Sequence, residues 1–340
     1  MDYLEIGNRK IGKLFKPLVI AEIGINHEGD INKAKKMVDD AISAGCECIK
    51  FQSHILDKEM IPNKVIPGNS KESIWDIIKR CSLTFDEEKK LKSYVEKKGK
   101  IFLSTPFSKE AAFNLNKLGV CAFKIGSGEC NNLPLIEYIL KFKKPILLST
   151  GMNNISMIDK SVKLIKKKKI PFILMHCVSI YPTPYEKASL AAIKQLKKKF
   201  KTDLVGLSDH SMGNYISFGA VALGARVIER HFTSKKNWKG PDIPISINKN
   251  ELKDLIEGCN SIYEGNKSKK QIFKEEGPTI KFAYSSVVAV KNIKKNEKIT
   301  TENTWVKRPG NGKIKAFDYH KILGLKLTRD VKINEQIDWK

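Results

Sequence analysis

The sequence predicts an α/β protein whose main domain is a closed (β/α)8 barrel. Short apolar runs alternate eight times with longer, lysine-rich amphipathic segments between residues 18 and 265. Each run is continuous rather than alternating, which is typical of strands buried on both faces of a parallel sheet. Eight such units over about 250 residues match the usual size of a closed barrel. The alternative is an open, doubly wound sheet, but no Gly-x-Gly-x-x-Gly motif follows the first run.

Each apolar run has the length of a single strand. The runs cover residues 18–24, 48–52, 101–106, 122–126, 145–150, 172–177, 204–209 and 226–232. The second connection, residues 55–82, is enlarged and carries Pro62, Pro67 and Gly68. Loops at the carboxyl ends of barrel strands build ligand sites, so we expect this segment to line one.

The repeating pattern stops at a polar, glycine-containing stretch around residues 265–278, which reads as a linker. Beyond it, residues 285–290, 298–300 and 304–306 read as short strands separated by turns. We therefore predict a barrel domain over residues 1–265, a linker over 266–280 and a small β-rich domain over 281–340.

The composition is that of a globular protein, with 41% hydrophobic and 29% charged residues in a chain of 340. Its amino terminus has no apolar signal core, and no apolar stretch approaches the roughly 20 residues of a membrane span. The seven cysteines contain no CxxC pair, which favours reduced thiols in the core. The sequence thus predicts a soluble, cytoplasmic protein that does not bind a membrane.

A net charge of +25 raises the question of nucleic-acid binding. Only six of the 62 basic residues are arginine, and the lysines form runs along the whole chain without interleaved aromatic residues. Nucleic-acid recognition favours arginine forks and stacking rings. We therefore expect no nucleic-acid partner, although the charge favours anionic substrates at long range.

Two apolar runs end in histidine, at His210 and His231. Residues 211–225 between them read as one helix, and two strands joined by one helix are normally parallel neighbours. Both imidazoles then emerge at the same end of the sheet, with Asp209 and Asp242 close in sequence. Two histidines in this arrangement suit a divalent metal that keeps open positions for a substrate.

Two lysines, Lys50 and Lys124, lie inside otherwise apolar strands, where an unpaired ammonium group is costly. A substrate phosphate or carboxylate would satisfy each lysine, and so would a buried carboxylate of the protein. The carboxylates Glu22, Glu129 and Asp242 follow other runs and add acid–base capacity at the same rim. The residues alone predict a metal-assisted enzyme with an anionic, phosphorylated substrate.

Motifs along nearly the whole chain resemble the bacterial sialic acid synthases. They are Glu22-Ile-Gly-Ile-Asn-His27, Lys50-Phe-Gln52, Val65-Ile-Pro-Gly-Asn69, Ser104-Thr-Pro-Phe107, Phe123-Lys-Ile-Gly-Ser-Gly-Glu129, Ser149-Thr-Gly-Met152, Tyr181-Pro-Thr-Pro184, Leu207-Ser-Asp-His210, Glu229-Arg-His-Phe-Thr233, Gly240-Pro-Asp242 and Lys307-Arg-Pro-Gly310. The resemblance implies a TIM barrel followed by an antifreeze-like (SAF) β-clip domain. It also implies condensation of phosphoenolpyruvate with an N-acetylated hexosamine, which yields phosphate and a nine-carbon 2-keto acid.

The resemblance carries roles onto matching positions. His210 and His231 would hold Mn²⁺ or Mg²⁺, and the catalytic candidates comprise these two residues with Glu22, Glu129 and Asp242. The phosphoenolpyruvate set would be Lys50, Thr105, Lys124, Ser127, Ser149 and Ser208, with Ser179 nearby. The sugar set would be Glu22, Gln52, Asn69, Tyr181 and Asp242. Arg308 would reach the N-acetyl group from the last domain of a partner subunit in a domain-swapped homodimer.

One position departs from the pattern of the N-acetylneuraminate synthases, which often carry Asn where this chain has Ser179. Synthases for other nonulosonic acids carry Ser there, whereas the loop ending in Asn69 favours the unmodified sugar. The sequence thus predicts an N-acetylneuraminate synthase acting on N-acetylmannosamine. The alternative within the class is a synthase for legionaminic or another modified nonulosonic acid. A carbohydrate- or nucleic-acid-binding protein is the alternative from another class, and it leaves the strand-end histidines, lysines and carboxylates unexplained.

Overall fold

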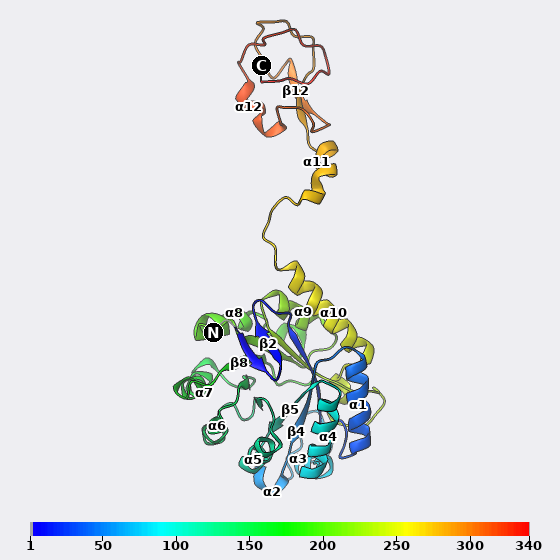
Figure 1. The fold of residues 1–340 in the computed structure, drawn as a ribbon, viewed down its shortest axis with the longest axis vertical. Helices are drawn as coiled ribbons and strands as arrows, with labels where there is room; N and C mark the ends of the chain where they lie inside the picture. The colour runs from blue at the N-terminus through cyan, green and yellow to red at the C-terminus, as the bar shows by residue number, and fades with distance from the viewer. Residues whose placement is uncertain (1–2, 340) are drawn as a thin grey trace. The chain divides into compact units, whose positions relative to one another are not determined.

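A computed structural model describes residues 3–339 of the protein. The chain divides into two compact units, Met1–Lys267 and Ser268–Lys340. Figure 1 shows the strands of the first unit surrounded by helices, and each unit is described below by itself.

The first unit is built on one sheet of eight parallel strands in the order β5-β4-β3-β10-β9-β8-β7-β6. The strands are β3 (Leu18–Gly24), β4 (Cys48–Ser53), β5 (Ile101–Pro106), β6 (Phe123–Ile125), β7 (Ile146–Ser149), β8 (Phe172–Cys177), β9 (Val205–Asp209) and β10 (Val227–His231). The outermost strands of this order, β5 and β6, contact each other, so the sheet curls into a near-closed barrel. The predicted (β/α)8 barrel is therefore confirmed.

Helices follow the strands and cover the outside of the barrel (Figure 1). They are α1 (Ile31–Ser43), α2 (Leu56–Glu59), α3 (Ile74–Cys81), α4 (Phe85–Lys97), α5 (Lys109–Leu118), α6 (Leu133–Leu140), α7 (Ile155–Lys167), α8 (Ala191–Phe200), α9 (Tyr215–Ala222) and α10 (Lys249–Gly265), with 3-10 turns η1 (Tyr185–Lys187) and η2 (Ile243–Ile245). The side chains of Asp30, Thr84 and Ser108 cap α1, α4 and α5 by accepting hydrogen bonds from backbone amides. Among the residues described, no helix has the length and apolar character needed to cross a membrane.

A β-hairpin precedes the barrel and was not among the predicted elements. Its strands, β1 (Tyr3–Ile6) and β2 (Arg9–Gly12), pair antiparallel. Leu4, Ile6 and Ile11 are buried in one cluster with residues from the starts of the barrel strands, including Leu18 and Leu147. The hairpin therefore closes the amino-terminal end of the barrel with apolar side chains.

The enlarged connection after β4 folds into α2 and α3 and has a small core of its own, formed by Ile25, Ile77, Ile78 and Cys81. Asn69 of this segment donates a hydrogen bond to the carbonyl oxygen of Pro241, 3.3 Å away. The segment therefore contacts the loop that follows β10, at the carboxyl end of the barrel.

The second unit is small and has an apolar core that includes Val287, Ile299, Ile314 and Val331. Its elements are η3 (Lys274–Glu276), α11 (Gly277–Ala283), β11 (Ser286–Ala289), β12 (Thr304–Lys307), η4 (Ala316–Asp318) and α12 (Tyr319–Ile322). Strands β11 and β12 pair antiparallel. The predicted strand at residues 298–300 is instead a single bridge between Lys298 and Lys326.

Candidate active site

The carboxyl ends of the barrel strands bring charged side chains into the barrel interior. Side chains alternate along a strand, so Glu229 and His231 of β10 share one face and Arg230 between them takes the other. By the same alternation, Ser208 and His210, two residues apart at the end of β9, share one face. These positions form two levels, a buried cluster of lysines and carboxylates and a pair of histidines nearer the strand ends.

Lys50 of β4 is held by carboxylates and a hydroxyl. Its Nζ lies 2.7 Å from Glu22 Oε2 and donates a hydrogen bond to Thr105 Oγ1 at 3.0 Å. The Oε2 atom of Glu229 lies 3.9 Å from the same nitrogen. Three neighbouring strands thus supply the surroundings of one ammonium group.

Lys124 of β6 faces the other oxygen of the same carboxylate. Its Nζ lies 3.5 Å from Glu229 Oε1 and donates to Ser149 Oγ at 2.7 Å. Ser208 Oγ donates to Glu229 Oε1 at 3.0 Å. A buried carboxylate of the protein therefore lies close to each lysine, which is one of the two alternatives that the sequence leaves open.

The sequence did not predict the role of Glu229 in this cluster. It bridges the two lysines, and only 4% of its surface is exposed. A charged residue within an apolar strand is the signal that singled out Lys50 and Lys124, and it applies equally to Glu229. Two buried cations require buried anions, and sequence spacing does not say which strand supplies them.

The ionisation of the two lysines differs although both are buried. Burial opposes the charge of Lys50, but Glu22 and Glu229 outweigh it and raise its pKa. Burial lowers the pKa of Lys124, which has Glu229 alone as a close partner and feels the charge of Lys50. The pKa of Glu229 is lowered, because the two lysines and the Ser208 hydroxyl overcome the cost of burying its charge.

His210 and His231 lie side by side above this cluster, with ring centroids 5.4 Å apart. His210 Nδ1 lies 2.9 Å from the carbonyl oxygen of Val178. A carbonyl only accepts, so Nδ1 carries a proton, and in the neutral imidazole the lone pair of Nε2 is then free. His231 Nδ1 is buried without a hydrogen-bond partner, 3.7 Å from Asp242 Oδ2. Burial lowers the pKa of His231 and keeps its imidazole neutral, as a metal ligand must be.

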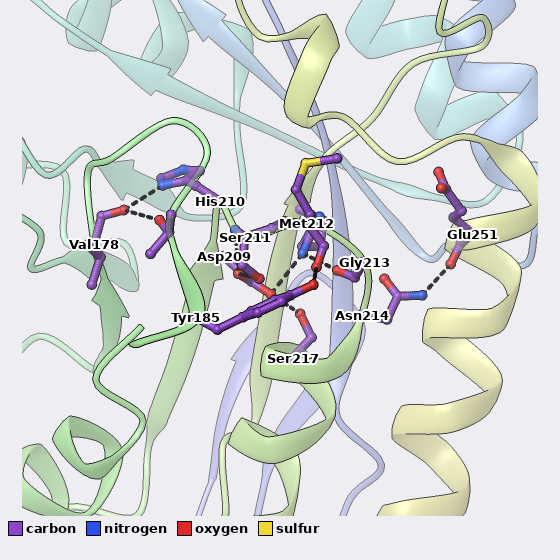
Figure 2. Close-up of polar contacts among 12 residues, drawn as sticks. Val178, Tyr185, Asp209, His210, Ser211, Met212, Gly213, Asn214, Ser217 and Glu251 are labelled. Atoms are coloured by element: carbon purple, nitrogen blue, oxygen red, sulfur yellow. Dashed lines mark hydrogen bonds and ion pairs between the residues drawn. The ribbon is translucent and has the colours of Figure 1, made fainter. Parts of the chain in front are cut away.

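Asp209 is close to His210 in sequence, but its carboxylate is bound on the opposite face of the strand. Asp209 alternates to the opposite face, where its Oδ2 accepts from Arg230 at 2.9 Å and Ser217 at 2.6 Å. Ser211 donates to Oδ1 through its amide and its hydroxyl (Figure 2). The aspartate thus fixes the turn after β9 that carries His210. This turn occupies the first part of the predicted helix 211–225, which is why α9 begins only at Tyr215.

A cavity of about 570 Å³ opens beside the histidines, between the enlarged connection and the loops that follow β8 and β10. Its polar lining residues are Gln52, His54, Asn69, Ser179, Tyr181 and Asp242. The rest is largely apolar and includes Ile25, Ile74, Ile77, Ile78, Phe107 and Ile180. Tyr181 packs on His210 with ring centroids 4.2 Å apart, which links this cavity to the histidine pair.

Three predicted site residues lie outside these contacts. Glu129 accepts a hydrogen bond from Asn132, and burial raises the pKa of its carboxyl. Ser127 Oγ accepts from the amide of Gly151 at 3.1 Å, which fixes the loops after β6 and β7. Arg308 is an exposed residue of the second unit and follows β12. Their predicted roles stay predictions.

Among residues 3–339, no three His, Cys, Asp or Glu side chains gather closely enough to enclose a metal ion.

Known proteins match the chain over its full length. The NeuB family model matches residues 37–271 and the SAF domain model matches residues 284–340. An N,N'-diacetyllegionaminic acid synthase of Campylobacter jejuni is 40% identical over 335 residues, covering 95% of this chain and 99% of the relative. An uncharacterised protein of Methanocaldococcus jannaschii is 39% identical over 341 residues, with 100% and 98% covered.

Among solved structures, the N-acetylneuraminic acid (sialic acid) synthetase of Leptospira borgpetersenii superposes with a TM-score of 0.74 at 35% identity. The match covers 82% of this chain and 95% of that one. The SAF match identifies the predicted β-clip domain in the carboxyl-terminal part of the chain. The protein therefore belongs to the NeuB family and is an enzyme of the nonulosonic acid synthases, which make sialic, legionaminic and pseudaminic acids.

Proposed function

We propose that the enzyme condenses phosphoenolpyruvate with the open-chain form of a 2-acetamido hexose. The observation that carries this proposal is the arrangement of Lys50, Lys124 and their hydroxyl partners directly below the histidine pair. The ammonium groups and the hydroxyls of Thr105 and Ser149 supply hydrogen-bond donors to a small, multiply charged anion. Donor-rich interiors of this kind suit a phosphate ester with a carboxylate.

In the proposed reaction, carbon 3 of phosphoenolpyruvate attacks the aldehyde carbon of the sugar and forms the new carbon–carbon bond. Water then adds at carbon 2, and phosphate leaves by cleavage of the carbon–oxygen bond. Lys50 and Lys124 neutralise the carboxylate and phosphate during these steps. Glu22 and Asp242 lie at the sugar side and are the candidates for moving protons.

The histidine pair fits a divalent cation, Mn²⁺ or Mg²⁺. His210 donates from Nδ1 to a carbonyl, which is the usual second contact of a histidine that binds a metal through Nε2. The unpartnered, buried Nδ1 of His231 supports the same assignment. When bound, the cation would act as a Lewis acid toward the sugar aldehyde. It would also add positive charge to a site in which Glu22 and Glu229 offset part of the charge of the two lysines.

Two acceptors fit the cavity beside the histidines. The isoleucines at 74, 77 and 78 give it an apolar wall, which favours the 6-deoxy-4-acetamido sugar of legionaminic acid synthesis with its additional methyl groups. The similarity to the Campylobacter synthase supports the same choice. N-acetylmannosamine, the acceptor that the sequence predicts, is the second candidate and is supported by the similarity to the Leptospira enzyme.

Release of phosphate from phosphoenolpyruvate, measured with each sugar and Mn²⁺, tests both parts of the proposal. We expect turnover with either acetamido sugar and at least about a tenfold higher kcat/KM for the 6-deoxy-4-acetamido sugar. A higher kcat/KM for N-acetylmannosamine would reverse the choice of acceptor. An absence of phosphate release with both sugars would refute the reaction itself.

A further inference from the structure

A histidine just after β4, His54, lines the cavity and is joined to Glu22 through a chain of hydrogen bonds, but the reaction proposed above assigns it no role. His54 is buried, and its ring stacks on Phe107 with centroids 4.4 Å apart and planes at 11°. Its Nδ1 lies 2.9 and 3.0 Å from the two carboxylate oxygens of Glu59, at the end of α2. Its Nε2 lies 3.1 Å from Gln52 Oε1.

The hydrogen bonds of Gln52 determine which atoms of this chain carry protons. Gln52 Nε2 donates to Glu22 Oε1 at 3.1 Å, and the other oxygen of Glu22 is paired with Lys50. An ionised carboxylate only accepts hydrogen bonds, so the amide of Gln52 must present its nitrogen to Glu22. Its oxygen then faces His54, and Nε2 of the imidazole must be a donor.

Glu59 completes the arrangement from the other side of the ring. Its carboxylate contacts Nδ1 with both oxygens, and its side chain is 4% exposed. A carboxylate that faces Nδ1 with both oxygens fixes the orientation of the ring. The segment that supplies Glu59 is part of the enlarged connection that also lines the sugar cavity.

We propose that His54 and Glu59 form a positioning pair that sets the orientation of the Gln52 amide toward Glu22 and the sugar cavity. If the proton were missing from His54 Nε2, the amide oxygen of Gln52 would face a lone pair, and the amide would turn its nitrogen away from Glu22. Gln52 lines the sugar cavity, and Glu22, which also pairs with Lys50, is assigned to the sugar by the proposed function, whereas Lys124 and Ser149 do not contact the pair. The proposal rests on the proposed function and deepens it, because it predicts an effect on the sugar and not on phosphoenolpyruvate.

Two substitutions of His54 separate its two hydrogen bonds. Asparagine places an amide nitrogen near the position of Nδ1 and loses the donor to Gln52, whereas glutamine places one near Nε2 and keeps that donor. Both variants lose the stacking on Phe107, and each keeps a different one of the two hydrogen bonds, so a larger loss in His54→Asn than in His54→Gln assigns the effect to the bond with Gln52 and not to the bond with Glu59. We expect His54→Asn to raise the KM for the sugar about tenfold, the effect of losing one hydrogen bond. His54→Gln should stay within about threefold, and the KM for phosphoenolpyruvate should change less than about twofold in both.

A double-mutant cycle supplies a second kinetic readout. In a Gln52→Ala background the amide is absent, so His54→Asn should cause no further rise in the KM for the sugar. Thermal unfolding of each variant reports loss of structure separately from positioning. A sugar KM unchanged in His54→Asn, equal losses in the two His54 variants, or parallel rises in both KM values would each overturn the proposal.

A readout without turnover distinguishes failure of this proposal from failure of the proposed function. The chain has six histidines, so NMR of the ¹⁵N-histidine-labelled protein can resolve the His54 ring, assigned by the signal that disappears in His54→Gln. We expect a protonated Nε2 whose resonance shifts on Gln52→Ala. An Nε2 without a proton would overturn the positioning pair even in an active enzyme, and a protonated, Gln52-dependent Nε2 would support it even if neither sugar is turned over.

Discussion

Replacement of Glu229 by glutamine removes one of the two carboxylates that balance Lys50 and Lys124. The substituted side chain has the same size and can still accept from Ser208, which donates to Oε1 at 3.0 Å. The change therefore deletes a charge with little change in packing. What remains is two ammonium groups, each 3% exposed, with Glu22 as the partner of one of them.

The magnitude follows from burial. Removal of one partner of a buried ion pair costs about 3–5 kcal/mol, because the other charge stays buried without compensation. The pKa of Lys124 is already lowered by burial, so loss of its proton limits the cost and places it near the lower end of this range. About 3 kcal/mol corresponds to a decrease in Tm of about 6–12 °C for a unit of this size.

Differential scanning fluorimetry of Glu229→Gln beside Glu257→Gln measures this effect. Glu257 pairs with Lys253 at 3.8 Å, but both side chains are about two-thirds exposed, at 64% and 67%. Exposed pairs contribute about 0–1 kcal/mol, so this control should lose at most a few degrees. Inorganic phosphate should also raise the Tm of Glu229→Gln more than that of the unmodified enzyme, because the variant has surplus positive charge. A Tm loss equal to that of the control, or no selective effect of phosphate, would refute the structural role assigned to Glu229.

The remaining predictions concern the metal, the last domain and pH. His210→Ala should abolish metal-dependent turnover while Tm stays near that of the unmodified enzyme, and full activity of this variant in chelated buffer would exclude the two-histidine site. Mixtures of Arg308→Ala with Lys124→Ala should recover activity through hybrid dimers, whereas a monomer without complementation would argue against a shared site. Burial raises the pKa of Glu88 from 4.5 to about 7, and Ser53, which donates to it at 3.0 Å, opposes this shift only in part. In the unfolded chain the Glu88 carboxyl loses its proton at a lower pH than in the folded protein. The free energy of unfolding should therefore fall by about 3 kcal/mol as pH rises from 4.5 to above 7. Denaturant titrations of Glu88→Gln at several pH values should lack that slope.

The barrel could be predicted because each strand is a continuous apolar run bounded by polar residues. The runs at 18–24, 101–106 and 172–177 coincide with β3, β5 and β8, and the others differ by a residue or so at their ends. The amino-terminal hairpin escaped prediction because neither strand is a continuous apolar run: β1 alternates exposed and buried residues, and β2 begins with Arg9 and Lys10. Its stability comes from contacts with strand starts far along the chain, which a local pattern does not contain.

The site could be predicted as a set of positions but not as a set of partners. Strand-end reasoning brought Lys50, Lys124, His210 and His231 to one end of the barrel, as the structure shows. It could not tell that Glu229 bridges the lysines, because pairing depends on which side chains meet across the barrel interior. The side chain of Asp209 lies on the opposite face from that of His210, because successive side chains along a strand point to opposite sides.

The apolar hairpin at the amino-terminal end of the barrel has a consequence for the order in which substrates bind. Leu4, Ile6 and Ile11 fill the amino-terminal end of the barrel, so we expect molecules to enter and leave at the carboxyl ends of the strands. The lysines lie deeper than the cavity that Asn69 and Tyr181 line. On the proposed assignment the sugar therefore covers the path to the lysines. Phosphoenolpyruvate must bind before its co-substrate, and the nine-carbon product must depart before phosphate can. The enzyme is thus expected to follow a compulsory-order mechanism in which phosphate acts as a competitive inhibitor toward phosphoenolpyruvate.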